Sequence, residues 1–386
     1  MTDAPRVDLE QSGLTIHVAT GTAGRIQAHY ANYMWLRDNC PSSFDQKIGD
    51  RQFDIVSAPA DIRPDDARIE CGDLVITWAG DGHVSRYDIG WLTGWLIHPG
   101  HEDPARIEPR YWGAGFRDNL STFQLKTLIA DRAAYRSYLA TLLRDGIAMV
   151  EDVPDDEEGV RLVAEIAGHV RSSFSGYYFD VKAYPSPVGT AYTAQALEPH
   201  TDNPCEEFPA GLQYLHCRVN DTTGGETTFV DGAAVAMKLK ATHPKDYEIL
   251  SSVSVPFRFS HTKIDMRARQ TVIILDDRGE FVGVTISQHM ADLFDLDQRL
   301  LDSYYPAFRR FASMLRDPEH MMPIRLAAGQ CIVFDNQRIV HGRAAYDPTS
   351  GSRLLRGCYT DRGELRSRYR VAIRDTSPFP NEGSPA

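Results

Sequence analysis

The sequence predicts a mainly β protein with flanking helices, in which a small β-rich N-terminal domain precedes a larger β-sandwich or jelly-roll domain. Three observations predict this fold class. Strand-like alternation of apolar and polar residues dominates roughly the first 100 residues. Two amphipathic helical patterns then open the second part of the chain. Many short strands follow at irregular spacing, interrupted by helical insertions and without any internal repeat.

We expect the N-terminal domain to span residues 1–100. Its predicted strands are separated by Gly, Asp and Pro turns and lie at 14–19, 52–57, 73–79 and 83–89. The segment AGDGH at 79–83 is typical of a hairpin turn between the last two strands. Residues 101–120 are rich in proline, glycine and charge, so we expect a linker that runs over the surface.

We expect the larger domain to span residues 121–376, and the last residues, 377–386, to form a disordered tail. The spacing of apolar residues predicts a helix over 131–146 that stops at a glycine, and a second helix over 156–173. Residues 147–153 between them are predicted to be a strand. The later strands are predicted at 211–219, 226–232, 271–276, 280–287, 329–336 and 353–360, with helical insertions at 234–253 and 297–317.

The composition indicates a globular protein that does not bind nucleic acid or a membrane. The 386-residue chain has 41 Lys and Arg against 53 Asp and Glu, a formal net charge of −12. Nucleic acid and anionic membranes both require a basic surface. No apolar run approaches the roughly 20 residues of a membrane span, and we see no signal peptide. Six scattered cysteines without a CxxC pair are typical of reduced thiols, so we expect a cytoplasmic location.

His200 and Asp202, in the stretch EPHTDNP, are two positions apart. In an extended segment this spacing puts both side chains on one face. Taken alone, the pair fits a hydrogen-bonded loop equally well. A second histidine on a neighbouring strand would complete the two-His, one-carboxylate triad of non-haem Fe(II) oxygenases, which leaves three coordination positions open. His341, just after the predicted strand 329–336, is the best candidate among the 13 histidines.

Two further residues fit a cosubstrate that carries a carboxylate. Arg353 follows His341 by 12 positions, and its guanidinium could pair with such a group through two hydrogen bonds. Thr227, in the stretch GGETTF, could add a hydroxyl contact. In isolation His341 fits a core histidine and Arg353 fits a surface salt bridge. The order and spacing of all these residues together favour a site.

These residues lie in a sequence that resembles the Fe(II)/2-oxoglutarate dioxygenases related to γ-butyrobetaine hydroxylase and trimethyllysine hydroxylase. The resemblance covers roughly residues 14–372 and rests on several signatures in the same order, among them WLRDNCP, TAYTAQALEPHTD, GLQYLHC, TGGETTFVDG, FDNQRIVHGR and RLLRGCYTDRGEL. It implies a jelly-roll catalytic domain, also called a double-stranded β-helix, after a small β-rich domain. It also implies a homodimer.

The resemblance implies a role for each residue of the site. His200, Asp202 and His341 match the iron ligands, Arg353 matches the residue that binds the distal carboxylate of 2-oxoglutarate, and Thr227 matches a threonine that assists it. One oxygen atom of O₂ would enter the substrate and the other would enter succinate. Since Asp202 is retained, hydroxylation rather than halogenation is the expected outcome.

The resemblance also implies a small zwitterionic substrate whose trimethylammonium group is bound by an aromatic cage. Tyr192 and Tyr359 match cage positions, Phe179 stands where another aromatic is usual, and Ser175 stands where a tyrosine is usual, with Tyr177 nearby. These aromatic residues would also fit an ordinary core.

The opposite end of the substrate is less well matched. Ser287 and Gln288, together with Gly189, stand where asparagines contact a substrate carboxylate in γ-butyrobetaine hydroxylases. Asn203 is expected to face the substrate.

These features leave several functions open. γ-Butyrobetaine, giving carnitine, is the default substrate. The alternatives are 2-(trimethylamino)ethylphosphonate, trimethyllysine and a substrate without a quaternary ammonium group. A function of another class is a non-catalytic jelly-roll module that binds a ligand, but such a module would not need His200, Asp202, His341 and Arg353 together.

The N-terminal domain departs from the family at its zinc site. Relatives bind structural zinc through three clustered cysteines and a later histidine. Here Cys40 and His83 stand in matching places, but Ser42 and Asp45 occupy the other two. Because a structural zinc site normally needs four nitrogen or sulfur ligands, we expect no structural zinc.

Overall fold

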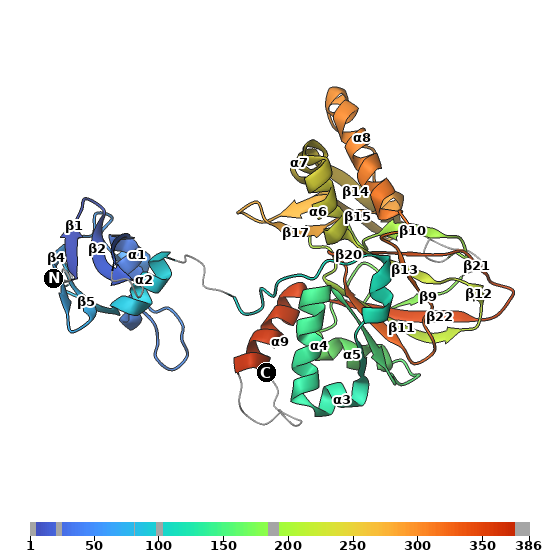
Figure 1. Cartoon of the computed structure of the whole chain (residues 1–386), viewed down its shortest axis with the longest axis horizontal. Coiled ribbons are helices and arrows are strands. Elements are labelled where there is room, and N and C mark those ends of the chain that lie inside the picture. The colour runs from blue at the N-terminus through green and yellow to red at the C-terminus, as the bar shows by residue number, and fades with distance from the viewer. Residues whose placement is uncertain (1–4, 21–24, 81, 98–102, 184–192, 375–386) are drawn as a thin grey trace. The chain divides into compact units, whose positions relative to one another are not determined.

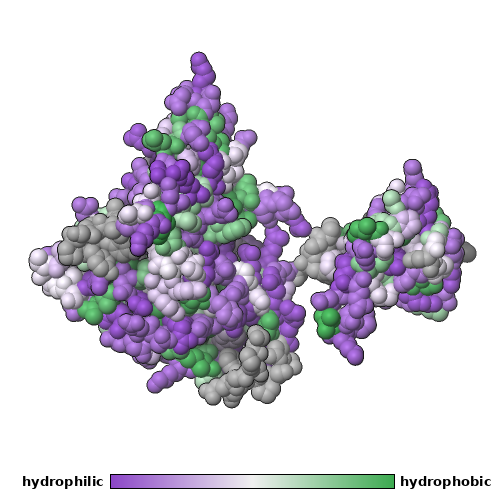
Figure 2. All heavy atoms as spheres, turned by 180° about the vertical axis from the view of Figure 1, so that it is seen from behind, coloured by the Kyte–Doolittle hydropathy of each residue, from purple (hydrophilic) through white to green (hydrophobic). Residues whose placement is uncertain are grey.

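The computed structural model describes residues 5–20, 25–80, 82–97, 103–183 and 193–374. The chain divides into two compact units, Met1–Asp103 and Pro104–Ala386, and each is described by itself. The predicted tail at 377–386 lies outside the described residues. The face shown in Figure 2 is mostly hydrophilic on both units. Among the described helices, none is both long and apolar enough to cross a membrane.

The smaller unit contains two antiparallel three-stranded sheets. Its strands are β1 (Arg6–Leu9), β2 (Gly13–Thr20) and β3 (Arg25–Asn32) in one sheet, and β4 (Pro64–Glu70), β5 (Asp73–Trp78) and β6 (Val84–Asp88) in the other, and its helices are α1 (Tyr33–Asp38) and α2 (Ile89–Ile97). Apolar residues of both sheets share one core, in which the rings of Tyr33 and Trp78 meet edge to face at 6.1 Å. Three predicted strands are confirmed.

The strand predicted at 52–57 is wrong. Residues Ile55–Ser57 form a short 3-10 helix instead, and the side chain of Asp54 accepts a hydrogen bond from the Val56 N–H at 3.0 Å. An aspartate that caps the backbone in this way competes with strand pairing. Val56 is 85% exposed, so its β-branched side chain contributes little to a core.

The positions that match the zinc site of relatives hold a hydrogen-bonded group. Cys40 Sγ lies 3.0 Å from Ser42 Oγ and 3.6 Å from His83 Nε2, and Ser42 Oγ lies 3.1 Å from the same imidazole nitrogen. The Asp45 carboxylate accepts hydrogen bonds from backbone N–H groups of its own loop. One thiol and one imidazole are half of the usual donor set, so these residues do not fit structural zinc.

The larger unit is built around two sheets. The six-stranded sheet has the order β7-β8-β19-β11-β22-β9, and the four-stranded sheet has the order β10-β20-β13-β18. The strands of the first are β7 (Thr122–Gln124), β8 (Ile147–Glu151), β19 (Cys331–Asp335), β11 (Leu212–Asn220), β22 (Arg353–Thr360) and β9 (Phe179–Val181). Those of the second are β10 (Leu197–His200), β20 (Ile339–Arg343), β13 (Thr227–Asp231) and β18 (Met322–Ile324).

Side chains point alternately to the two faces of each strand, and those on the inner faces form a core between the two sheets. Leu215 and Leu355 of the large sheet and Phe229 and Ile339 of the small sheet belong to one buried cluster. Residues of the opposite pleat of the large sheet, such as Tyr214, pack under helices instead. These helices, grouped together in Figure 1, are α3 (Leu125–Ala130), α4 (Arg132–Asp145), α5 (Gly159–Ala167) and α9 (Arg362–Arg374).

Helix α4 ends as the sequence predicts. Its N-cap is Asp131, whose side chain accepts from the Ala133 N–H. Gly146 follows its last residue with φ 74°, a left-handed conformation that glycine adopts without steric strain. Strand β8 begins directly afterwards, so the glycine turns the chain from the helical layer into the sheet.

A third group of elements covers the outer side of the small sheet. It contains α6 (Gly232–Thr242), α7 (Pro244–Ser252), α8 (Gln298–Leu315), the hairpin β14 (Ser254–His261) and β15 (Ile264–Thr271), and the pair β16 (Ile273–Leu275) and β17 (Phe281–Val284). The remaining strands, β12 (Thr223–Gly224) and β21 (Tyr346–Asp347), pair with each other. The predicted insertion 234–253 is two helices, because Pro244 cannot continue α6 and starts α7 at its first position.

The segment predicted as a linker differs from the expectation. From Pro104 onward it belongs to the larger unit, where the rings of Trp112 and Phe116 are buried and stacked at 5.1 Å. The Trp112 N–H donates to the Asp231 carboxylate at 3.2 Å. Two large aromatic rings bury enough apolar area to fix this proline-rich segment to the sheets.

Candidate active site

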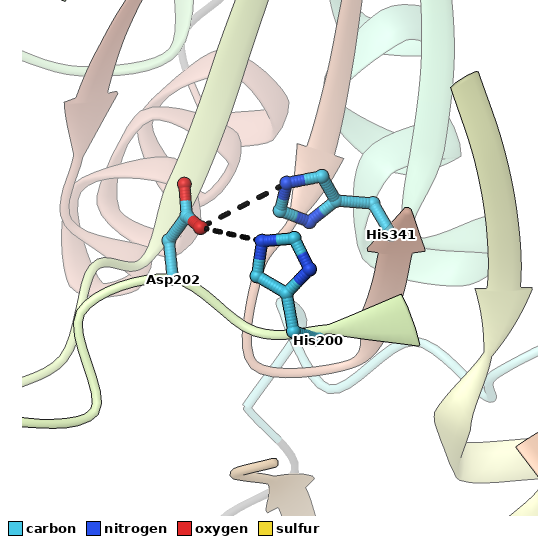
Figure 3. Close-up of side chains that lie close together, drawn as sticks. All are labelled: His200, Asp202 and His341. Carbon is cyan, nitrogen blue, oxygen red and sulfur yellow. Dashed lines mark ion pairs between the residues drawn. The ribbon is translucent and has the colours of Figure 1, made fainter. Parts of the chain in front are cut away.

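The two histidines of the predicted metal site face each other across two strands. His200 is the last residue of β10 and is paired in register with His341 on β20. Figure 3 shows the Asp202 carboxylate directed toward both imidazole rings. Asp202 Oδ1 lies 3.2 Å from His200 Nε2 and 3.8 Å from His341 Nε2. The three candidate ligand atoms all lie within 4.8 Å of one another.

The local chain explains why His200 and Asp202 share one side. Thr201 between them is buried, and it exchanges hydrogen bonds with Ile286, including its N–H to the Ile286 carbonyl at 2.6 Å. The buried Asn336 side chain accepts from the Asp202 N–H at 2.7 Å and donates to the Asp202 carbonyl at 3.1 Å. These contacts fix the backbone on both sides of the carboxylate.

Hydrogen bonding and burial also set the state of the three groups. His200 Nδ1–H donates to the Glu198 carbonyl at 2.8 Å, so Nε2 is the ring nitrogen on the side of Asp202. Burial, with a further contribution from His200, lowers the pKa of His341 to about 3, so this imidazole is neutral at pH 7. Burial opposes ionisation of Asp202, but His341, His200 and the Tyr359 hydroxyl hold its pKa below the usual range.

The geometry fits an iron(II) ion. Neighbouring ligands of a six-coordinate ion with bonds of about 2.1 Å lie roughly 3 Å apart. The 3.2 Å separation of Asp202 Oδ1 from His200 Nε2 is close to this value, and the 3.8 Å separation from His341 Nε2 is somewhat longer. Two imidazoles and one carboxylate on one side of a metal form the facial triad of non-haem iron oxygenases, with the other positions open.

The same three residues line a cavity of about 600 Å³ that also contains Arg353 and Thr227. Arg353 is 7% exposed, and its Nε and Nη1 have no hydrogen-bond partner among the described residues. Burial, and then the nearby Arg343, lower its pKa to about 10, so the guanidinium keeps its charge at pH 7. The guanidinium lies 5.4 Å from the centroid of the Tyr346 ring, but two of its nitrogens still lack a hydrogen-bond acceptor among the described residues, and such a buried charge calls for an anionic ligand.

Some of the predicted substrate residues also line this cavity. Phe179 on β9 and Tyr359 on β22 stack at 5.0 Å between ring centroids. Asn203, with φ 56°, is buried against the cavity, and its amide nitrogen lies 3.4 Å from Glu206 Oε1. Ser175 lines the cavity as well.

Other predicted substrate residues lie elsewhere. Tyr177 is 59% exposed and is absent from the cavity lining. Ser287 is buried outside the cavity, and its hydroxyl lies 3.4 Å from His289 Nδ1. Gln288 lines a second cavity of about 280 Å³, between β10 and α8. Tyr192 lies outside the described residues.

The structure adds cavity residues that the sequence interpretation did not select. Arg258 and Phe259 come from the hairpin β14–β15, and Phe259 stacks on Phe174 at 4.4 Å. The apolar alternation at Val255, Phe257 and Phe259 is the sequence signal for this hairpin. Gln213 on β11 is 1% exposed, lines the cavity, and its Oε1 lacks a partner among the described residues.

His289 occupies the wall between the two cavities. Its ring meets that of His200 edge to face at 4.9 Å. Burial, with a further contribution from His200, lowers its pKa to about 4, so the ring is neutral at pH 7. It therefore presents a neutral hydrogen-bonding group beside the candidate metal ligands.

Comparison with known proteins gives a consistent result. Residues 106–359 match the family described as taurine catabolism dioxygenase TauD, TfdA family. A gamma-butyrobetaine dioxygenase of Pseudomonas sp. (strain AK-1) is 35% identical over 369 residues, which cover 94% of each chain. That of Homo sapiens is 29% identical, with 88% of this chain and 90% of the relative covered. The mitochondrial trimethyllysine dioxygenase of Rattus norvegicus is 28% identical, with 88% and 82% covered.

Proposed function

This chain belongs to the TauD, TfdA family of Fe(II)- and 2-oxoglutarate-dependent dioxygenases, and we propose that it hydroxylates a small trimethylammonium zwitterion, with γ-butyrobetaine as substrate and carnitine as product. One observation carries the proposal. A single cavity contains the group His200, Asp202 and His341, the Arg353 guanidinium with two nitrogens that lack hydrogen-bond partners among the described residues, and a stacked aromatic pair.

Each group has a distinct role in this proposal. His200, Asp202 and His341 hold iron from one side. Arg353 binds the distal carboxylate of 2-oxoglutarate, assisted by the Thr227 hydroxyl. When bound, iron and 2-oxoglutarate supply the oxidation, in which one oxygen atom of O₂ enters the substrate and the other enters succinate.

We assign the aromatic pair of Phe179 and Tyr359 to the cationic end of the substrate. A quaternary ammonium group is attracted to the faces of aromatic rings, and the attraction grows when water is excluded. Fixing this end places one carbon of the short zwitterion next to the metal ligands, since both rings line the same cavity as the triad. Asn203 is the nearby neutral hydrogen-bonding group in this assignment.

Hydroxylation of 2-(trimethylamino)ethylphosphonate is a second candidate function, favoured by Arg258. This arginine belongs to the hairpin β14–β15 and lines the cavity. It also forms an ion pair with Asp265, with 3.2 Å between Nη2 and Oδ2. A guanidinium pairs well with the two negative charges of a phosphonate. The positions that contact a carboxylate in γ-butyrobetaine hydroxylases, Ser287 and Gln288, do not line the same cavity.

We further infer from the family membership that the two facing sheets of the larger unit form a double-stranded β-helix and that the enzyme is a homodimer. The scattered cysteines without a CxxC pair support the proposal of a cytoplasmic location. The facing sheets share one buried core, as this architecture requires. Light scattering on the purified protein should give twice the chain mass.

A ligand panel tests the substrate. Protein loaded with Mn(II) and 2-oxoglutarate without O₂ is screened for thermal stabilisation by γ-butyrobetaine, trimethyllysine, the phosphonate and their dimethylamino analogues. Each stabilising compound is then assayed for succinate release and hydroxylated product with Fe(II) and O₂. We expect γ-butyrobetaine to give the largest stabilisation and to stimulate succinate release.

The panel separates the alternatives. Equal stabilisation by the dimethylamino analogues would contradict recognition of a quaternary ammonium group. A preference for the phosphonate that is lost in Arg258→Gln would favour the second candidate function. Stabilisation without any succinate release would indicate a non-catalytic binding protein.

A further inference from the structure

The two oxygens of the Asp202 carboxylate have different neighbours. Oδ1 is the atom that faces the Nε2 atoms of His200 and His341. Oδ2 accepts a hydrogen bond from the Tyr359 hydroxyl at 2.7 Å. Tyr359 is 4% exposed, so water competes little for this hydrogen bond. The carboxylate is therefore divided into one oxygen directed at the candidate metal position and one bound by the protein.

The tyrosine is itself held on two sides. Its backbone is paired with Gln213 on β11, in the middle of the six-stranded sheet. Its ring stacks on Phe179 at 5.0 Å with 27° between the planes. A hydroxyl on a ring that cannot swing away gives a hydrogen bond of fixed direction.

The division of the two oxygens has a chemical consequence. A carboxylate can bind a metal through one oxygen or through both. Binding through both oxygens would occupy one more coordination position, so that the protein would fill four of the six. The carboxylate would then compete with a bidentate cosubstrate and O₂. A hydroxyl that donates to Oδ2 favours binding through Oδ1 alone.

We propose that Tyr359 is a positioning residue, whose hydroxyl holds Asp202 as a one-oxygen metal ligand in addition to any contact of its ring with substrate. This inference rests on the proposed iron site. It also links the aromatic wall to the metal, because one ring contacts Phe179 and, through its hydroxyl, the Asp202 ligand.

Tyr359→Phe tests the hydroxyl, since phenylalanine keeps the ring and its stacking. The metal-free variant is titrated with Mn(II) alone, and unbound Mn(II) is counted from its aqueous electron paramagnetic resonance signal. We expect the affinity to fall about tenfold or more, as on loss of other groups that orient metal ligands. An affinity within about twofold of wild type would overturn the proposal, because groups that orient ligands normally contribute more.

Tyr214→Phe is the matched control. Tyr214 is a fully buried tyrosine on the neighbouring strand, and its hydroxyl lies 3.1 Å from Thr360 Oγ1 on the helix-covered side of the sheet. Its loss removes a buried hydroxyl of the same sheet without touching Asp202. We expect unchanged Mn(II) affinity in this variant, and a loss equal to that of Tyr359→Phe would assign the effect to the sheet and overturn the proposal.

A second pair of variants tests the donor independently of Tyr359→Phe. Tyr359→Trp keeps an aromatic ring with an N–H donor that does not bind metals, and Tyr359→Leu has neither ring nor donor, so the tryptophan variant should bind Mn(II) more tightly. Equal affinities would contradict the role of the donor. Failure of the iron site itself gives a different result, because the wild-type protein would then not bind Mn(II) in the same titration.

Discussion

At the scale of single residues, Arg353 has surroundings that define its role narrowly. It is buried, charged at pH 7, and two of its guanidinium nitrogens lack partners among the described residues. Arg353→Lys keeps the charge but loses the planar pair of donors. We expect the KM for 2-oxoglutarate to rise about 10- to 100-fold, the range of 1–3 kcal/mol for an imperfectly paired charged hydrogen bond.

The change is measured as succinate formed at saturating substrate. Arg161→Lys serves as the matched control, since Arg161 is a partly exposed arginine on α5 that pairs with Glu158 and Glu165. The KM of Arg161→Lys for 2-oxoglutarate should equal that of wild type. An unchanged KM in Arg353→Lys would remove this residue from the cosubstrate site.

The sequence indicates the residues of the site whose spacing is regular, and misses those that depend on the tertiary fold. The alternation of His200 and Asp202 and the strand before His341 are visible along the chain. The hydrogen bond of Tyr359 to Asp202 joins segments 157 residues apart, so no local pattern reveals it. Arg258 likewise reaches the cavity only through the position of its hairpin.

At the scale of elements, a buried ion pair fixes the strand that carries His341. Arg338 precedes β20 and bonds the Asp231 carboxylate, with 2.8 Å from Nη2 to Oδ2. Asp231 also caps α6 by accepting from the Ala233 N–H. Arg338→Met would leave this carboxylate buried without its cation, so we expect the free energy of unfolding to fall by about 3–5 kcal/mol.

Urea denaturation followed by circular dichroism measures that loss. Arg310→Met is the control, because Arg310 on α8 makes a comparable pair with Asp246 in which the arginine side chain is 45% exposed. Its loss should change the unfolding free energy by less than about 1 kcal/mol. Equal losses in the two variants would show that burial of the Arg338 pair does not stabilise the fold.

A second charged group predicts how stability depends on pH. Asp145 ends α4, is fully buried, and accepts two hydrogen bonds from Arg110, at 2.8 and 2.6 Å. Burial raises its pKa, but the hydrogen bonds from Arg144 and Arg110 outweigh burial and lower it. The unfolded chain therefore takes up this proton at higher pH than the folded chain.

The stabilisation by Asp145 should thus be complete above its unfolded pKa of about 3.9 and be lost as the pH falls below it. Asp145→Asn should be less stable than wild type by about 1–3 kcal/mol at pH 7. Urea unfolding at pH 7, 5, 4 and 3 should show this difference shrinking at the acid end. A difference in unfolding free energy between the two proteins that stays constant with pH would contradict a lowered pKa of Asp145 in the folded state.

The elements themselves were predictable where the pattern is long and capped. Helix α4 and strands β11, β19 and β22 lie where the apolar spacing places them. The break between α6 and α7 follows from one proline, which the continuous apolar spacing concealed. The hairpin β14–β15 was missed because its outer residues are charged and partly exposed, which weakens the apolar signal.

At the scale of the whole molecule, the sequence indicates two units, but not where the second begins. Proline and glycine predict a linker over 101–120, whereas Trp112 and Phe116 are buried in the larger unit. Apolar packing of two aromatic rings decides the structure of this segment, and composition alone does not reveal their partners.

The two units should differ in their metal content. The larger unit has the group His200, Asp202 and His341, whereas Cys40 and His83 of the smaller unit have Ser42 as their third neighbour. Elemental analysis of protein reconstituted with Fe(II) and Zn(II) together, then freed of weakly bound metal, should give one metal per chain. His200→Ala should reduce this to none, and retention of zinc in that variant would indicate a metal site in the smaller unit.

Visible absorption of the metal-free protein after anaerobic addition of Fe(II) and 2-oxoglutarate tests the central claim most directly. If iron bound to His200, Asp202 and His341 chelates the cosubstrate, we expect a weak charge-transfer band. This band should shift on addition of γ-butyrobetaine and be absent in His341→Ala. No band in the wild-type protein, or the same band in His341→Ala, would contradict the assignment of these three side chains as the iron site.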